Sequence, residues 1–246
     1  MTPMKKAQLF FLHFAGGSVY SFNAITSRLK DISVIPIELP GRGRRIQERL
    51  LQDFDMAATD LFNQIVLNLN GAPFLIYGHS MGAYLGLRVS NMLESVGRPP
   101  SYLIVSGNAG PGIKSEGAVK RYLLGKEAFI EELKTLGGVP EQVFHDPELF
   151  NFFEPILRAD FQIVETNELA NEPAVAAPLY ALMGSEEKNV DQIANWGRFT
   201  HSDFCSEILE GNHFFIHKHA SQVAQILRGL YELVAAKERS SYYCPK

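Results

Sequence analysis

Cysteine and net positive charge are both scarce in this sequence. Its 246 residues contain two cysteines, Cys205 and Cys244, and the formal net charge is −4. Two cysteines cannot form a disulfide framework in a chain of this length, so we expect free thiols and a cytoplasmic location. The negative net charge excludes a strongly basic nucleic-acid-binding protein, because phosphate backbones attract positively charged surfaces.

Long hydrophobic runs are also missing. No stretch approaches the roughly 20 apolar residues that a membrane-spanning helix needs. The apolar run at 9–12 is shorter than the core of a signal peptide, and His13 follows it. We therefore expect no membrane partner. The hydrophobic content of 46% excludes a disordered chain and is sufficient for one core, so residues 1–246 are expected to form a single domain.

Short apolar runs alternate with segments of helical periodicity along most of the chain. This alternation predicts an α/β fold with a mostly parallel central sheet and helices on both faces. Strands are predicted at 8–14, 33–39, 74–77, 102–105, 178–183 and 204–209. Helices are predicted at 21–30, at 55–70 with Asp55 as N-cap, at 81–96 and at 220–236. Residues 110–172 show helical patterns without strands, which indicates a helical insertion within the domain.

The strongest local motif is Gly-His-Ser-Met-Gly at 78–82. It fits G-x-S-x-G and lies between a predicted strand and a predicted helix, the context in which such a serine is a nucleophile. The flanking glycines permit a tight turn that exposes the Ser80 hydroxyl. The backbone N–H of Met81, at the start of the helix, points toward the same position and can stabilise an oxyanion.

A serine nucleophile needs a base, and His213 is the histidine best placed to supply it. It follows the last predicted strand, so its loop returns to the sheet edge that carries Ser80. The other histidines after Ser80 fit less well by position: His145, His201, His217 and His219. No acidic residue completes a metal-binding pattern with the histidines at 213–219, so no metal site is predicted.

A carboxylate that orients the base is expected in the loop after the strand at 178–183. Glu186, Glu187 and Asp191 are the candidates, and position favours Glu187 over Asp191. A second oxyanion donor is expected from the loop after the first strand, where Ala15 precedes two glycines. Neither G-x-G-x-x-G nor G-x-x-x-x-G-K-[ST] occurs, which argues against a phosphate-binding role for these glycines.

Together these motifs make the chain resemble the external type II thioesterases of non-ribosomal peptide and polyketide assembly lines. These enzymes are α/β-hydrolases that remove acyl groups from the phosphopantetheine arm of carrier proteins. The landmarks occur in the family's order: FAGG at 14–17, LPGRG at 39–43, GHSMG at 78–82, FEPILRAD at 153–160, Trp196 and GNHFF at 211–215.

The resemblance implies the role of each matched residue. Ser80 would be the nucleophile, His213 the base, and Glu187 the acid at a position where the family usually has aspartate, with Asp191 as the alternative. The N–H groups of Ala15 and Met81 would form the oxyanion hole, and residues 110–172 a lid. The resemblance also implies a monomer that needs no cofactor and meets carrier proteins transiently, since the phosphopantetheine belongs to the carrier.

Carrier proteins are typically acidic, so an acidic enzyme would need a local basic surface to bind one. Arg42, Arg44 and Arg45 are the candidates for such docking, followed by Arg49, and a second basic group is Lys114, Lys120, Arg121 and Lys126. An ordinary solvated basic face is the alternative interpretation. A generic esterase or lipase, an acyltransferase and a non-catalytic binding module remain as alternative functions.

Overall fold

The computed structural model describes residues 5–113 and 119–242, with side chains up to Lys237. Its centre is a six-stranded sheet in the order β2-β1-β3-β4-β5-β6, and every pairing between neighbouring strands is parallel. The strands are β1 (Gln8–Leu12), β2 (Ser33–Ile37), β3 (Phe74–His79), β4 (Tyr102–Ser106), β5 (Leu179–Gly184) and β6 (Phe204–Leu209). All six lie within or next to the predicted apolar runs, and the predicted parallel sheet is confirmed.

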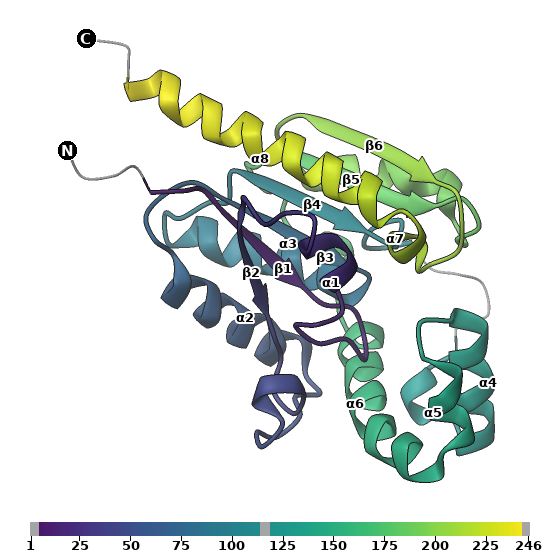
Figure 1. Cartoon of the computed structure of the whole chain (residues 1–246). Helices are drawn as coiled ribbons and strands as arrows, with labels where there is room; N and C mark the ends of the chain where they lie inside the picture. Colours follow the sequence, from purple (N-terminus) through teal and green to yellow (C-terminus); the bar gives the residue numbers. More distant parts are fainter. Residues whose placement is uncertain (1–4, 114–118, 243–246) are drawn as a thin grey trace.

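Helices cover both faces of this sheet (Figure 1). On one face, α2 (Phe54–Asn68) and α3 (Met81–Ser95) pack on Phe10 and Ile76. On the other face, α1 (Asn23–Thr26) and α8 (Ala220–Tyr242) pack on Phe11 and Tyr77. Because successive side chains of a strand point to opposite faces, the inner strands β1, β3, β4 and β5 contribute to both apolar layers and are almost entirely buried, whereas the edge strand β6 exposes Cys205 and Ser206.

The segment between β4 and β5 is the predicted helical insertion. It contains η2 (Arg121–Leu123), α4 (Lys126–Leu136), α5 (Glu141–His145), α6 (Pro147–Glu165) and η3 (Leu169–Asn171). The helices α4, α5 and α6 lie beyond the carboxyl ends of the strands, away from both chain termini (Figure 1). They share an apolar cluster that includes Phe129, Leu133 and Phe150, so the insertion has packing of its own.

Several predicted boundaries were wrong for local reasons. Helix α2 is capped by Asp53 rather than Asp55, because the Asp53 side chain accepts a hydrogen bond from the N–H of Met56. The helix expected at 21–30 is only the four residues of α1, and α8 continues past 236 to Tyr242.

Cys205 is an exposed free thiol, whereas Cys244 lies outside the described residues. No described helix is long and apolar enough to cross a membrane.

Candidate active site

The motif at 78–82 forms a sharp turn between β3 and α3. Ser80 has a positive φ of 55°, which a non-glycine residue adopts only when the surroundings enforce it. Its N–H donates to the carbonyl oxygen of Ser106 at 2.7 Å. A Cβ on Gly78 would lie 2.0 Å from the carbonyl oxygen of Gly82, and one on Gly82 would lie 2.2 Å from that of Leu12. Gly78 is therefore required for the turn to close, and Gly82 is required for the start of α3 to approach the end of β1.

Three predicted side chains from distant loops meet at this turn. The Nε2 atom of His213 lies 2.9 Å from the Oγ of Ser80, and its Nδ1 lies 2.7 Å from an Oε of Glu187. The other Glu187 oxygen accepts the N–H of Gly184 at 2.8 Å. These contacts fix a tautomer with hydrogen on Nδ1, which leaves Nε2 free to accept the serine proton.

The three candidate acids occupy different environments, and Glu186 is exposed. The Glu187 side chain is 6% exposed and holds His213, whereas Asp191 is exposed in the first turn of η4 (Val190–Phe199). His213 follows β6, as the sequence predicted, and precedes the short helix α7 (Phe215–Lys218), which was not predicted. The remaining candidate histidines do not join the site, and His145 and His201 are exposed.

Sequence reasoning missed His79 and Asn108, which surround the serine. His79 is fully buried, its ring centroid lies 5.1 Å from that of His213, and its Nδ1 contacts the Ser106 hydroxyl at 2.8 Å. Burial and the neighbouring His213 hold the pKa of His79 well below its ordinary value, so its ring is uncharged. Asn108 donates to the carbonyl oxygen of Ser80 at 3.0 Å and so supports the strained turn. Position at the carboxyl end of β4 was the available signal for Asn108.

The expected oxyanion donors belong to two different elements. Met81 is the first residue of α3, and Ala15, in the loop after β1, lines the same cavity as Ser80 and His213. The N–H of the next residue, Gly16, is already used, because it donates to the carboxylate of Asp160 at 2.7 Å. This contact connects the loop after β1 to helix α6.

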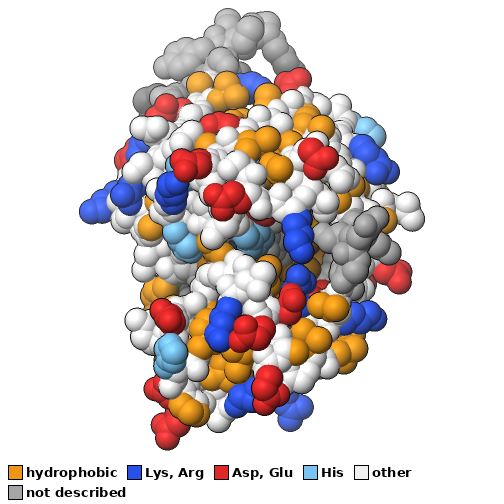
Figure 2. Space-filling model, turned by 90° about the vertical axis from the view of Figure 1, so that its right-hand side faces the viewer, with side chains coloured by type: hydrophobic (Ala, Val, Ile, Leu, Met, Phe, Trp, Pro, Cys, Tyr) orange, Lys and Arg blue, Asp and Glu red, His pale blue; other side chains and the backbone are white. Residues whose placement is uncertain are grey.

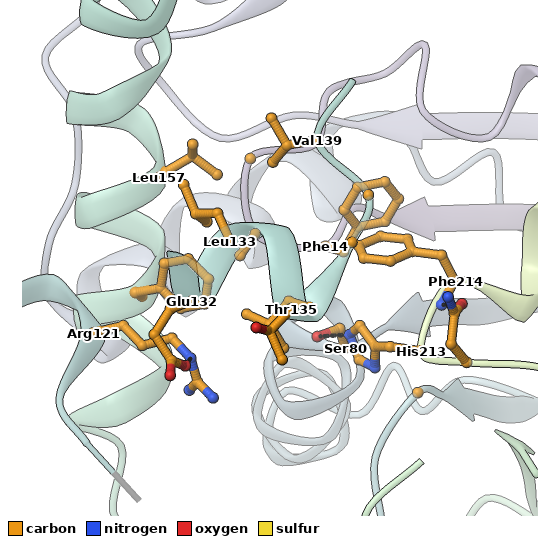
Figure 3. A pocket seen from close by; sticks show the side chains of 18 of the residues that line it. Phe14, Ser80, Arg121, Glu132, Leu133, Thr135, Val139, Leu157, His213 and Phe214 are labelled. Carbon is orange, nitrogen blue, oxygen red and sulfur yellow. Dashed lines mark hydrogen bonds and ion pairs between the residues drawn. The ribbon is translucent and has the colours of Figure 1, made fainter. Parts of the chain in front are cut away.

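A cavity of about 730 Å³ extends from Ser80 and His213 into the helical insertion. The space-filling view shows the hollow between the two parts of the molecule (Figure 2). Apolar side chains from the insertion, including Leu133, Val139 and Leu157, line it (Figure 3). Arg121 and Glu132 form an ion pair at the wall away from the serine. The volume is typical of sites for small organic groups.

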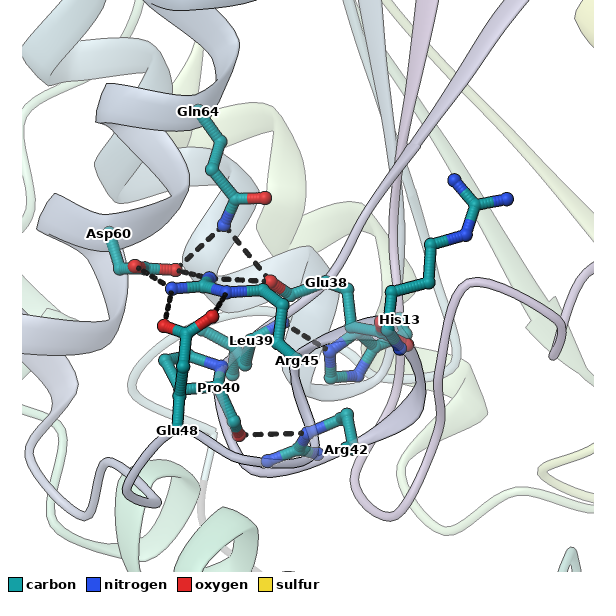
Figure 4. A network of polar contacts seen from close by, with 10 residues as sticks. His13, Glu38, Leu39, Pro40, Arg42, Arg45, Glu48, Asp60 and Gln64 are labelled. Atoms are coloured by element: carbon teal, nitrogen blue, oxygen red, sulfur yellow. Dashed lines mark hydrogen bonds and ion pairs between the residues drawn. The ribbon is translucent and has the colours of Figure 1, made fainter.

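The arginines expected to form a docking surface are not equivalent. The assignment of Arg42 was wrong, because its side chain is 3% exposed and forms a bidentate ion pair with Asp160. Arg45 is engaged with Glu48 and Asp60 (Figure 4). Arg44 is exposed, as are Arg49, Lys120 and Lys126, while Arg121 contacts Glu132 and Glu165. Lys114 lies outside the described residues.

Within the described residues, no three His, Cys, Asp or Glu side chains are grouped closely enough to hold a metal ion.

The family model described as "Thioesterase domain" matches residues 7–231. The chain belongs to the thioesterase domain family. It is an enzyme that cleaves thioesters, and its parallel sheet with inserted helices has the α/β-hydrolase fold that the resemblance implied.

Relatives with similar sequences and structures span nearly the whole chain. "Linear gramicidin dehydrogenase LgrE" of Brevibacillus parabrevis is 30% identical over 92% of this chain and 88% of that protein. ClbQ from the colibactin NRPS/PKS pathway superposes with a TM-score of 0.87 at 29% identity, covering 94% and 99% of the two chains. The type II thioesterase BorB from the borrelidin biosynthetic cluster has a TM-score of 0.83 at 30% identity, covering 92% and 93%. The chain is thus a homologue of type II thioesterases.

Proposed function

We propose that this thioesterase releases acyl groups from the phosphopantetheine arm of carrier proteins through an acyl-enzyme at Ser80. The observation that supports this most directly is the continuous contact from Ser80 through His213 to Glu187, at the floor of an apolar cavity. The resemblance of the chain to BorB, a thioesterase of a biosynthetic cluster, supports the carrier-bound substrate. The proposed role is the editing or release of stalled acyl chains.

In the proposed first step, the Ser80 Oγ attacks the thioester carbonyl while its proton passes to Nε2 of His213. The negative charge on Glu187 stabilises the imidazolium that forms. The C–S bond then breaks, and His213 returns the proton to the departing pantetheine thiol. In the second step, water attacks the acyl-serine ester with His213 again as base, which releases the acid and restores the serine.

Each of the two steps passes through a tetrahedral intermediate with a negatively charged oxygen. We propose that the N–H groups of Ala15 and Met81 donate hydrogen bonds to that oxygen. The positive end of α3 adds to this stabilisation, because the helix begins at Met81. Since these groups and the triad supply the nucleophile, the base and the electrostatic stabilisation, the proposed reaction needs no metal or other cofactor. Phosphopantetheine enters as part of the substrate.

We also propose that residues 110–172 act as the lid of an acyl chamber. The apolar side chains that α4 and α6 contribute to the cavity suit a hydrocarbon chain, and the enclosure would limit the entry of water and of competing nucleophiles. Carrier docking would then use exposed cations such as Arg44 and Arg49, since Arg42 and Arg45 are engaged within the protein.

The test compares hydrolysis of three substrates with the same acyl group: the acyl-carrier protein, the acyl-pantetheine thioester and the ethyl ester. We expect kcat/KM to be highest for the acyl-carrier, and Ser80→Ala to lower kcat at least about 10⁴-fold with no labelling by a fluorophosphonate. Ser95→Ala is the matched control, because it makes the same substitution at the far end of α3.

Each alternative function has its own outcome. Equal rates on the carrier and on the simple ester would indicate a generic esterase. Product formation only when an amine or alcohol is added would indicate an acyltransferase. A wild-type protein that neither turns over any substrate nor reacts with the fluorophosphonate would indicate a binding module.

A further inference from the structure

Asp160, in the C-terminal half of α6, carries a carboxylate with no exposure to solvent. Its carboxylate receives both terminal nitrogens of Arg42, one of them at 2.8 Å, and also the N–H of Gly16 at 2.7 Å. These partners come from loops 118 and 144 residues away in sequence. A buried charge is costly unless it is fully paired, so the three groups hold one another in one arrangement.

Helix α6 contacts the same loop a second time, through Leu157. Gly16 has a positive φ of 76°, and a Cβ at this position would lie 2.5 Å from the Leu157 Cδ2 atom. Leu157 and Asp160 are three residues apart and so share one face of α6. The helix therefore presses on Gly16 with an apolar group and binds its N–H with a charged one.

The turn that carries Arg42 is hydrogen-bonded to His13, which directly follows β1. The N–H of Leu39 donates to Nε2 of His13 at 3.2 Å, so Nδ1 carries the ring proton and donates to the carbonyl oxygen of Phe14 at 2.9 Å (Figure 4). Pro40 accepts from the Nε of Arg42. The loop at 14–17 is thus enclosed between β1, the turn at 39–42 and α6.

We propose that Arg42 and Asp160 are positioning residues, which orient the N–H of Ala15 toward the oxyanion by fixing the adjacent Gly16 peptide. Helix α6 of the lid thereby becomes part of the support of the oxyanion hole. This inference rests on the proposed function, in which Ala15 is an oxyanion donor. It assigns a role in the acylation step to two side chains that do not touch the substrate.

The test replaces the ion pair in two ways that differ in the acceptor for Gly16. Arg42→Met with Asp160→Leu removes both charges and the acceptor, and such apolar replacements of buried pairs preserve folding in other proteins. Arg42→Met with Asp160→Asn removes both charges but keeps a carbonyl oxygen for the Gly16 N–H. Arg88→Met is the control, because it makes the same substitution at an arginine of α3 whose ion pair with Glu172 does not involve Gly16 or α6.

We expect the leucine double variant to lose about 10- to 100-fold in kcat on an acyl-N-acetylcysteamine thioester, with KM within about threefold of wild type. The affinity for a trifluoromethyl ketone, which forms an oxyanion on Ser80, should fall by the same factor. The asparagine double variant should recover most of both losses, and Arg88→Met should change neither. Rates are expressed per active site titrated with a fluorophosphonate.

A folded leucine double variant with wild-type kcat and ketone affinity would overturn the proposal, as would equal losses in the asparagine variant. If the leucine variant does not fold, Asp160→Glu decides, because it keeps the ion pair but moves the carboxylate by one carbon and should still lower kcat at least about tenfold. Failure of the proposed function is recognised separately, by a wild-type protein that is inactive or whose activity survives Ser80→Ala.

Discussion

Replacement of Glu187 by glutamine tests the proposed acid at constant volume. In the wild type, one Glu187 oxygen lies 2.7 Å from Nδ1 of His213 and the other accepts the N–H of Gly184. In Glu187→Gln, the amide oxygen remains the only acceptor for Gly184, so the amide NH₂ faces His213. The imidazole must then turn its lone pair to Nδ1 and carry its proton on Nε2, where it cannot accept the proton of Ser80.

The expected loss is large because two effects combine. The wrong tautomer removes the base, and the missing charge removes the partner of the imidazolium in a site where the carboxylate is only 6% exposed. Comparable carboxylate-to-amide changes in serine hydrolases lower kcat about 10⁴-fold. We therefore expect a loss of about 10³- to 10⁴-fold, or about 4 to 5.5 kcal/mol of transition-state stabilisation.

The assay is steady-state hydrolysis of an acyl-N-acetylcysteamine thioester, with thermal unfolding as the check on folding. The Tm should change by only a few degrees, since the contact with Gly184 is retained. Glu187→Asp keeps the charge but shortens the side chain by about 1.5 Å, and should lose about 10- to 100-fold. Full activity of Glu187→Gln, or an equal loss in Asp191→Asn, would refute the assignment of Glu187 as the acid.

Two further predictions concern stability. Gly82→Ala should lower the free energy of unfolding, measured by urea denaturation, by at least about 3 kcal/mol, because its Cβ would lie 2.2 Å from the Leu12 carbonyl oxygen. Gly229→Ala in α8 is the control and should be neutral or stabilising, because no atom lies within contact distance of the added Cβ. Burial and the nearby Arg42 lower the pKa of His13 to about 4 in the folded protein, compared with 6.5 in the unfolded chain. As the pH falls below about 6.5, His13 therefore binds a proton in the unfolded state before it does so in the folded state. Stability should fall by about 2 kcal/mol from this group between pH 8 and pH 5, and His13→Gln should abolish that part of the pH dependence; an unchanged pH profile would contradict it.

The sequence alone determined the features that depend on neighbouring residues. The positions of the inner strands followed from short apolar runs, because strands buried on both faces leave no polar alternation. The turn at Ser80 followed from Gly78 and Gly82, since a side chain on Gly78 would meet the Gly82 carbonyl and one on Gly82 would meet the Leu12 carbonyl at the end of β1. The order of elements then predicted that the loops carrying Ser80, Glu187 and His213 meet, because parallel strands bring the loops that follow them to one edge of the sheet.

Only the tertiary structure decided what the charged residues outside that edge do. Four arginines within eight residues read as a basic surface, yet Arg42 is buried and Arg45 is shared between two carboxylates. The partner of Arg42 is Asp160, 118 residues away, and no local pattern specifies such a contact. Burial makes the difference, because a charge removed from water must find its counter-charge through the folded arrangement of α6, the turn at 39–42 and the loop of Gly16.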